Sequence, residues 1–321
     1  DKIDELFSQV ERLEDEAVQE LIDQADVVCS TNSTSGSEVL SGQEFDLLVV
    51  DEATQATEPS ALIPLTKAKK VVLAGDHKQL PPTILNEEAK RKGLAKSLFE
   101  RLLEVHGSDI KQVLTLQYRM NQAIMNFSNR EFYDGQLEAA PAVENWTLDD
   151  LEIELPAGNS PAEQALSGDE VIAFLDTSGM EVSEHSKKDS TSVENQMEAD
   201  LVSEIVEQVS RTGIDLTEVA VITPYQDQVE LINKLVKPEE VEINTVDGFQ
   251  GREKEVIICS LVRNNERNQI GFLKDIRRLN VSLTRAKKKL IIVGDSETIA
   301  GHQVYNNLTN YVEKTGFYYE L

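Results

Sequence analysis

The sequence has few cysteines and no long apolar run, and each shortage excludes a class of protein. Its two cysteines, Cys29 and Cys259, lie far apart, and neither belongs to a CxxC or CxxH pattern. This disfavours a zinc site or a disulfide and favours a reducing, intracellular and cytoplasmic setting. No stretch approaches the roughly 18 uncharged apolar residues of a membrane-spanning helix, so we expect no membrane partner.

Basic residues are also scarce. The chain has 31 Lys and Arg against 58 Asp and Glu, which gives a formal net charge of -27. An acidic surface repels nucleic acid, so the net charge weighs against such a partner. A local basic groove can nevertheless coexist with an acidic exterior. The acidity also fits a salt-rich cytoplasm, so a halophilic host is one interpretation.

Six short apolar runs predict strands. They are continuous rather than alternating, which is typical of strands covered on both faces of a parallel sheet. The runs are LLVV from 47, VVLA from 71, VIAFL from 171, VAVI from 219, VIICSLV from 256 and LIIV from 290. Helical patterns lie between them, so we expect an α/β fold with parallel sheets flanked by helices.

One helix is predicted over residues 191–213. Thr191 and Glu194 form a capping signal at its start, and Gly213 marks its end. Apolar residues recur there at every fourth position: Met197, Leu201, Ile205 and Val209. In contrast, residues 138–168 are rich in Pro, Ala, Gly and acidic residues, which predicts a surface excursion with little regular structure.

Polar residues follow the apolar runs, and α/β sheets bind ligands at the carboxyl ends of their strands. Asp51 and Glu52 come directly after the run at 47–50. One carboxylate there could hold Mg²⁺, and its neighbour could deprotonate an attacking water. The pair therefore predicts nucleotide hydrolysis, although a solvated strand end is the alternative.

Three further side chains suit the same chemistry. Gln79, in GDHKQLPP, can hydrogen-bond a phosphate or the attacking water, although an ordinary turn is the alternative. Phosphoryl transfer also needs cations, because negative charge spreads over the γ-phosphate oxygens. Arg119 in LQYRMN and Arg285 in LNVSLTRAKK are candidates, since Arg is always charged and planar. A surface ion pair is the alternative for each arginine.

Six segments carry a family resemblance through their order along the chain. They are VVDEATQATEPSALIPL, VVLAGDHKQLPPTI, LTLQYRMN, VITPYQDQ, NTVDGFQGREKEVIICSLVR and RRLNVSLTRAKKKLIIVGD. In this order they resemble the motifs of superfamily 1 helicases of the Upf-like branch, over about Val27 to Asp295. The resemblance implies a RecA-like P-loop NTPase fold, in which ATP binds between two RecA-like domains.

The resemblance also implies roles for the acidic and basic candidates. Asp51 and Glu52 match the Walker B pair, that is, the magnesium ligand and the catalytic base. Gln79 matches the glutamine that senses the γ-phosphate. Arg119 and Arg285 match two arginines that the second RecA-like domain supplies to the nucleotide.

Other positions match contacts to nucleotide and nucleic acid. A loop facing the nucleotide phosphate and ribose is matched by Gln250, Gly251 and Glu253. Positions lining the nucleic-acid track are matched by Ser30, Thr31, Thr223, Pro224, Tyr225 and Thr245. Hydroxyls and amides on a phosphate backbone bind without reading sequence, which suits movement along any single strand. Core packing is the alternative for Tyr225.

Two stretches are interpreted as structural. Ser192, Asn195 and Glu198 match a recurrent S-x-x-N-x-x-E pattern, which we read as a helix start. Lys287, Lys288 and Lys289 are expected at a helix end and a strand edge.

The sequence lacks the family's GxxxxGK[ST] loop, whose amides and Lys cradle the phosphates. Gly36 and Gly42 have no GK[ST] after them. We therefore expect residues 1–92 to be the C-terminal part of RecA-like domain 1 and residues 93–321 to be a complete RecA-like domain 2. A sheet without its P-loop strand would expose edges and apolar faces. The missing upstream segment would lie in the same chain or in another.

Three functional hypotheses remain. The first is a fragment of an ATP-dependent helicase or translocase that uses ATP and Mg²⁺ and moves 5′ to 3′ on single-stranded DNA or RNA while unwinding duplexes. The second is a catalytically inactive nucleic-acid or protein binding module derived from a helicase, and the third is one chain of a split helicase. Without the P-loop, this chain alone is not expected to hydrolyse ATP. We expect a monomer.

Overall fold

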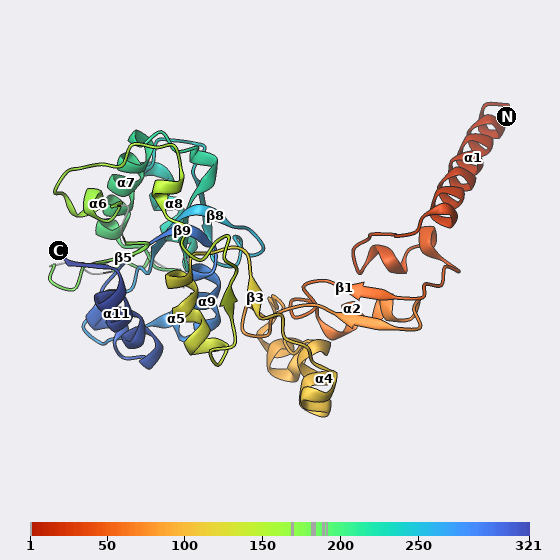
Figure 1. The fold of residues 1–321 in the computed structure, drawn as a ribbon. Coiled ribbons are helices and arrows are strands. Elements are labelled where there is room, and N and C mark those ends of the chain that lie inside the picture. The colour runs from red at the N-terminus through yellow and green to blue at the C-terminus, as the bar shows by residue number, and fades with distance from the viewer. Residues whose placement is uncertain (1, 168–169, 181–183, 188–189, 191) are drawn as a thin grey trace. The chain divides into compact units, whose positions relative to one another are not determined.

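The computed structural model describes residues 2–167, 170–180, 184–187, 190 and 192–321 (Figure 1). The chain divides into two compact units: the first comprises Asp1–His77 and Pro81–Gln112, and the second Lys78–Leu80 and Val113–Leu321. The first unit contains α1 (Lys2–Gln24), β1 (Leu48–Val50), α2 (Glu58–Leu65), β2 (Val71–Leu73), α3 (Glu87–Ala89) and α4 (Leu98–His106).

The second unit is the larger one. Its helices are α5 (Gln122–Phe132), α6 (Pro161–Gln164), α7 (Gln196–Arg211), α8 (Gln226–Leu235), α9 (Ile276–Leu283), α10 (Ser296–Ile299) and α11 (Gln303–Thr315). Its strands are β3 (Leu116–Gln117), β4 (Glu138–Ala139), β5 (Ile172–Asp176), β6 (Val219–Thr223), β7 (Glu242–Thr245), β8 (Lys254–Ser260), β9 (Ala286–Gly294) and β10 (Phe317–Glu320).

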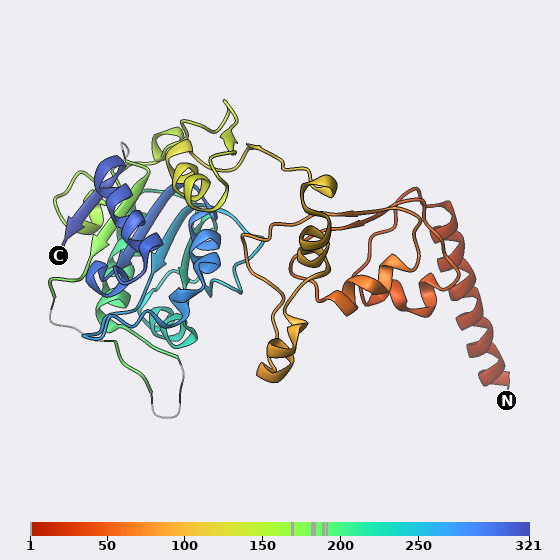
Figure 2. The same cartoon turned by 90° about the horizontal axis from the view of Figure 1, so that it is seen from below.

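A parallel sheet organises the second unit. Among the described residues, six strands pair in the order β10-β5-β9-β8-β6-β7, and every pairing is parallel. Helices cover both faces of this sheet, as Figure 2 shows. The predicted α/β fold with a RecA-like parallel sheet is therefore confirmed.

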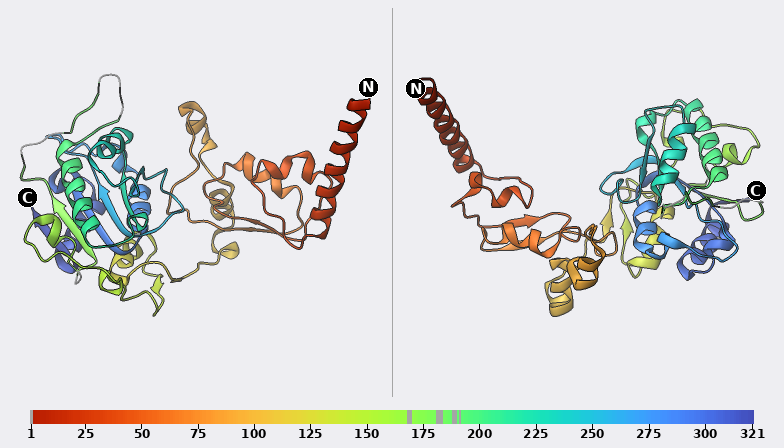
Figure 3. Two further views of the ribbon diagram at one scale, coloured as in Figure 1. Left: turned by 90° about the horizontal axis from the view of Figure 1, so that it is seen from above. Right: turned by 180° about the vertical axis from the view of Figure 1, so that it is seen from behind.

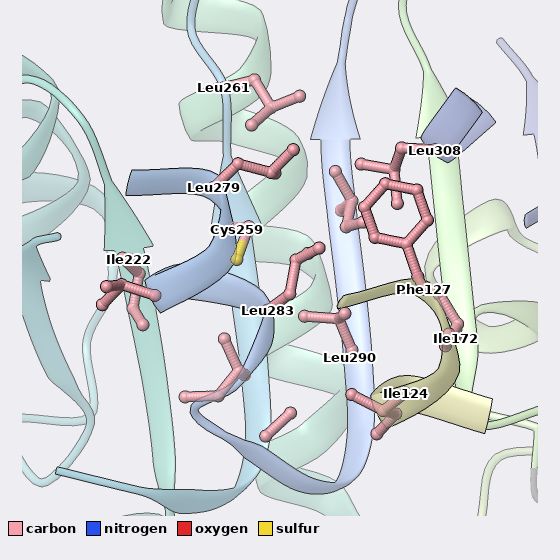
Figure 4. Close-up of a cluster of buried hydrophobic side chains, with 14 of the residues drawn as sticks. Ile124, Phe127, Ile172, Ile222, Cys259, Leu261, Leu279, Leu283, Leu290 and Leu308 are labelled. Carbon is pink, nitrogen blue, oxygen red and sulfur yellow. The ribbon is translucent and has the colours of Figure 1, made fainter. Parts of the chain in front are cut away.

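Alternate residues of the strands enter two separate cores. Ile172 of β5 and Leu290 of β9 pack with α5, α9 and α11, and Figure 4 shows the centre of this cluster. Their neighbours Ala173 and Ile291 pack instead with α6, α7 and α8. Because successive side chains of a strand point to opposite faces, a continuous apolar run fills both cores.

All six predicted strands form, but the pattern missed the two edge strands of the large sheet. β7 is half-buried along its length, and β10 is half-buried or exposed. An edge strand is covered less than a central one, so its sequence needs no continuous apolar run. Within residues 138–168, the predicted excursion holds β4, α6 and a short 3₁₀ turn, and buried Leu148 and Leu166 anchor it.

Helix α7 begins later than predicted. Asn195 is its N-cap, and the Asn195 side chain accepts a hydrogen bond from the Glu198 N–H at 3.2 Å. The structural interpretation of Asn195 is thus confirmed, whereas the predicted cap Thr191 lies outside the described residues. Gly213, with φ +86°, follows the last turn as predicted.

The three consecutive lysines lie at the start of β9, just after α9 ends, which fits the prediction of a helix end and a strand edge. β8 pairs alongside them, whereas the pairing with β5 begins only at Leu290. Lys288 lies over the Trp146 ring and pairs with Glu255, and the Lys289 amine donates to the Ser167 carbonyl at 2.9 Å. These cations are therefore committed to contacts within the unit.

The first unit leaves apolar surface uncovered. β1 and β2 form a two-stranded parallel sheet in which Val49 is 57% and Val72 48% exposed. α1, dark red in Figure 3, buries none of its residues 2–24. Exposed strand faces of this kind were predicted from the missing P-loop strand.

The division into two compact units follows packing within each unit. α4 belongs to the first unit, where Arg101 pairs with Glu58 of α2 at 2.6 Å. Residues 78–80 belong to the second unit because Leu80, 2% exposed, packs into its core.

Candidate functional site

Asp51 and Glu52 form a strained turn at the end of β1. Glu52 has φ +50°, a left-handed conformation that is uncommon for a side chain other than Gly. Its N–H donates to Asp51 Oδ1 at 3.0 Å, and Gln55 Nε2 donates to Glu52 Oε2 at 2.6 Å. Both carboxylates are exposed. The turn therefore presents two neighbouring acids at the carboxyl end of a strand.

Gln79 and Arg285 meet within the second unit. Arg285 Nη2 donates to Gln79 Oε1 at 3.1 Å across a separation of 206 residues. The Arg285 side chain is almost fully buried, and it also donates to the Val281 carbonyl at 3.1 Å. Neighbouring Lys78 is held in place because its carbonyl accepts from Asn280 Nδ2 at 3.0 Å.

Arg119 reaches the same place from the loop after β3. Its Nε donates to Glu253, and its Nη1 donates to the Thr284 carbonyl at 3.2 Å. Arg285 Nη2 contacts the hydroxyl of Thr284, also at 3.2 Å. Both guanidinium groups thus converge on one residue at the junction of α9 and β9. Two cations held this close repel each other, so the arrangement favours an anion beside them.

Glu253 is the acidic member of this cluster. Partial burial opposes its ionisation, but the hydrogen bond and charge of Arg119, together with Lys287, hold the pKa of Glu253 below its ordinary value. The Arg119–Glu253 pair is about one-third exposed, and such pairs contribute about 1 kcal/mol or less to stability. Glu253 therefore orients Arg119 more than it stabilises the fold.

Gln250 and Gly251 lie on the loop that leads to Glu253. Gly251 has φ +80°, which favours glycine, and no atom lies within 4 Å of where its Cβ would be. Gln250 is half-buried. We call Gln79, Arg119, Glu253 and Arg285 the arginine cluster, and Gln250 and Gly251 precede Glu253 on its loop.

The residues predicted to contact nucleic acid in the second unit differ in exposure. Thr223 and Tyr225 are 0% and 2% exposed, so neither side chain presents a surface to a strand. The Tyr225 ring stacks against Phe272, in the segment before α9. Pro224 and Thr245 are half-buried, and the Thr245 hydroxyl accepts from the Gly248 N–H at 3.2 Å.

Ser30 and Thr31 lie in the first unit, on an exposed loop after α1. The Thr31 hydroxyl accepts a hydrogen bond from the Thr34 N–H at 3.1 Å, which folds the loop into a tight turn. Both hydroxyl side chains remain accessible from solvent, as a contact to a phosphate backbone requires.

The described residues contain no group of three or more His, Cys, Asp or Glu side chains arranged to hold a metal. Mg²⁺ in nucleotide sites needs only one or two carboxylates, because phosphate oxygens and water supply the other ligands. Exposed Asp51 at the end of β1 fits this requirement. No helix in the described part of the chain is long and apolar enough to cross a membrane.

Two family models, each described as an AAA domain, match residues 94–297 and residues 1–87. The chain belongs to the AAA domain family. Within it, the sequence is that of the C-terminal region of a superfamily 1 helicase of the Upf-like branch.

Curated relatives of this AAA domain chain are longer proteins. An uncharacterized ATP-dependent helicase of Methanocaldococcus jannaschii is 41% identical over 314 residues, which are 97% of this chain and 45% of the relative. The DNA-binding protein SMUBP-2 of Mesocricetus auratus is 39% identical over 97% of this chain and 31% of its own length. A regulator of nonsense transcripts 1 homolog of Neurospora crassa is 37% identical over 95% of this chain and 28% of its own length. The chain spans less than half of each.

Sequence reasoning missed the residues that arrange the arginine cluster of the AAA domain chain. Thr284 contacts both arginines, and Asn280 fixes the segment that carries Gln79. Neither residue type indicates such a role by itself. Their position in the segment LNVSLTRAKK was the available signal, since Asn280 lies five residues before Arg285 and Thr284 directly before it.

Proposed function

We propose that this chain supplies the γ-phosphate side of an ATP-driven helicase or translocase motor that acts on single-stranded DNA or RNA. The observation that carries the proposal is the convergence of Arg119 and Arg285 on Thr284, with Gln79 bonded to Arg285. Two guanidinium groups and a neutral amide suit the γ-phosphate, whose oxygens gain charge in the transition state. The relatives' description as ATP-dependent helicases supports the nucleotide.

In this proposal Glu52 would accept a proton from the attacking water, and its neighbour Asp51 would hold Mg²⁺, which when bound would supply positive charge beside the phosphates. The hydrogen bond from Gln55 Nε2 holds the Glu52 carboxylate, and a general base must be held in position. Gln79 would report the γ-phosphate to Arg285 through the hydrogen bond that joins them. Glu253 would keep Arg119 oriented until a phosphate replaces it as the partner.

In this proposal only the accessible residues would contact the nucleic acid directly. Ser30, Thr31, Pro224 and Thr245 retain exposed surface, whereas Thr223 and Tyr225 would act from beneath it. Hydrolysis in the arginine cluster would then drive movement along one strand and the unwinding of a duplex.

The test uses the native protein that carries this sequence. Glu52→Gln should lower ATP turnover about 10²- to 10⁴-fold, as expected for a lost general base, while nucleotide binding stays within a few-fold. Arg119→Ala should lower turnover about 10³-fold or more. Glu44→Gln and Arg211→Ala, which change exposed residues of the same types outside the site, are the controls. Near-normal turnover in the Glu52 variant would refute the assignment.

We also propose that further chain, in the same polypeptide or another, completes the sheet of β1 and β2. Exposed Val49 and Val72 support this, because strand faces of this kind are normally covered. Amide hydrogen exchange of residues 47–73 is the measurement. Slow exchange in the native protein and fast exchange in this 321-residue chain would support the proposal, whereas equal rates would contradict it.

A further inference from the structure

Tyr225 supports a second aromatic ring that lies at the surface. The rings of Tyr225 and Phe272 are nearly parallel, with an angle of 16° and centroids 5.2 Å apart. Tyr225 is 2% exposed, whereas Phe272 is 48% exposed. The Tyr225 hydroxyl also accepts the Phe272 N–H at 3.1 Å. Tyr225 therefore fixes both the ring and the backbone of Phe272.

The backbone before Phe272 passes directly over polar groups. Gly271 has φ +53°, and a Cβ on it would lie 1.9 Å from Arg263 Nη1 and 2.4 Å from the Tyr225 hydroxyl. This close approach requires glycine. Arg263 is held in turn by two hydrogen bonds to Glu184, at 2.6 and 2.7 Å. An ion pair this buried gives little net stability, so it indicates a need for a fixed geometry.

Buried side chains hold the backbone just after the end of β8. Val262 has φ +72°, which is a genuine outlier for a β-branched residue. Its N–H donates to Glu198 Oε2 at 2.8 Å, and its carbonyl accepts from Asn195 Nδ2 at 3.1 Å. Both partners are buried. Strain persists only where surrounding contacts over-determine it, and it gathers at functional sites.

The segment that carries Phe272 is basic in an otherwise acidic chain. Residues 263–278 contain five Arg or Lys and two Asp or Glu, against a net charge of -27 for the whole sequence. Arg278 lies with its guanidinium 5.8 Å from the centre of the Phe272 ring and also pairs with Asp247. Arg267 and Lys274 are exposed nearby in the sequence.

A single exposed Phe needs no explanation, because most protein surfaces carry some. What calls for an explanation here is the support. The Tyr225 ring and hydroxyl hold Phe272 directly, and Arg263 and the strained Val262 hold Tyr225 in turn. An exposed aromatic ring among cations is the pattern by which proteins stack the bases of single strands.

We propose that Phe272 is the surface on which a base of a single-stranded nucleic acid stacks, and that Tyr225 is the residue positioning it. This rests on the proposed function, because it names a contact within the proposed nucleic-acid interface. Stacking tolerates every base, so it suits a protein that must travel along any sequence. A buried Tyr225 cannot contact the strand itself, but it can hold Phe272 in place.

The experiment measures binding of the native protein that carries this sequence to labelled 12-nucleotide strands of dT, of U, and of abasic sugar phosphate. Phe272→Leu should weaken binding to the dT or U strand about 5- to 100-fold and leave binding to the abasic strand unchanged. Phe272→Trp should restore binding. Tyr319→Leu, at an exposed aromatic of β10, is the control. The dT and U arms distinguish DNA from RNA.

The outcomes separate the two proposals. If the unchanged chain binds none of the strands, the proposed nucleic-acid function is wrong and this inference falls with it. If it binds, but Phe272→Leu binds equally well or loses the abasic strand to the same degree, the stacking role alone is wrong. Tyr225→Phe keeps the ring but removes its bond to the Phe272 N–H, so it should weaken binding less than Phe272→Leu. An equal or larger loss would contradict the positioning role.

Discussion

Replacing Glu198 by Gln should remove a pH dependence of stability from the second unit. Glu198 is fully buried beneath the strained Val262, and burial raises its pKa from 4.5 to about 8, despite hydrogen bonds from Ser260 and Val262 that lower it. Nearby Asp295 raises the pKa further. The folded chain therefore keeps this proton at pH values where the unfolded chain has released it.

The sign and size of the effect follow from this difference. Between pH 4.5 and about 8 the folded state binds more protons, so stability falls as the pH rises. At about 1.4 kcal/mol for each tenfold change, the full window corresponds to about 5 kcal/mol, and the part between pH 5 and 8 to about 3 to 4 kcal/mol. Gln cannot ionise, yet its carbonyl can accept the same two hydrogen bonds.

Urea unfolding followed by Trp146 fluorescence measures the effect, since Trp146 is the sole tryptophan and belongs to the second unit. At pH 5 the Glu198→Gln variant should match the unchanged chain, and at pH 8 it should be more stable by a few kcal/mol. Glu204→Gln, on the exposed side of α7, is the control. Parallel stability profiles for Glu198→Gln and the unchanged chain would refute the reasoning.

Two further predictions concern single buried contacts. Gly213→Ala adds a Cβ in open space at positive φ and should lower the free energy of unfolding by about 1–2 kcal/mol. In Gly271→Ala the added Cβ also meets Arg263 and Tyr225, so this variant should lose about 1–3 kcal/mol more. Equal losses of the two variants in urea unfolding would show that the contact at Gly271 is unimportant. Burial lowers the pKa of Lys289 to about 7, so stability should rise from pH 7 toward 10 as the unfolded chain alone stays protonated. Lys289→Met should abolish that rise in stability, whereas the control Lys314→Met, at an exposed lysine, should keep it. A rise that survives in Lys289→Met would show that Lys289 is not its source.

The sequence predicted central elements better than edges. Runs such as VAVI at 219 predicted strands correctly, because a strand buried on both faces must be apolar throughout. β7 and β10 were not predicted, because half-covered strands contain both polar and apolar residues. The candidate residues Gln79, Arg119 and Arg285 were named from motifs. The contacts of Arg119 with Thr284 and of Gln79 with Arg285, however, depend on packing between segments more than 150 residues apart.

Tyr225 shows most clearly that a sequence motif does not predict burial. The motif placed an aromatic residue near a nucleic-acid interface, but burial depends on what the rest of the chain lays over it. Here the loop ending at Phe272 covers the Tyr225 ring and leaves Phe272 itself half exposed. A local pattern identifies the loop, whereas the fold decides which ring reaches solvent.

Helix α9 has a mechanical consequence. It has eight residues and is therefore about 12 Å long, too short to bend appreciably. Arg278, near its start, lies over Phe272 and pairs with Asp247, while Thr284 and Arg285 follow its last residue. If the two proposals hold, a shift of this helix along its axis would move the proposed base contact at Phe272 and the proposed phosphate contact at Arg285 by the same amount. A short rigid helix with an arginine near each end would then couple the two proposed sites.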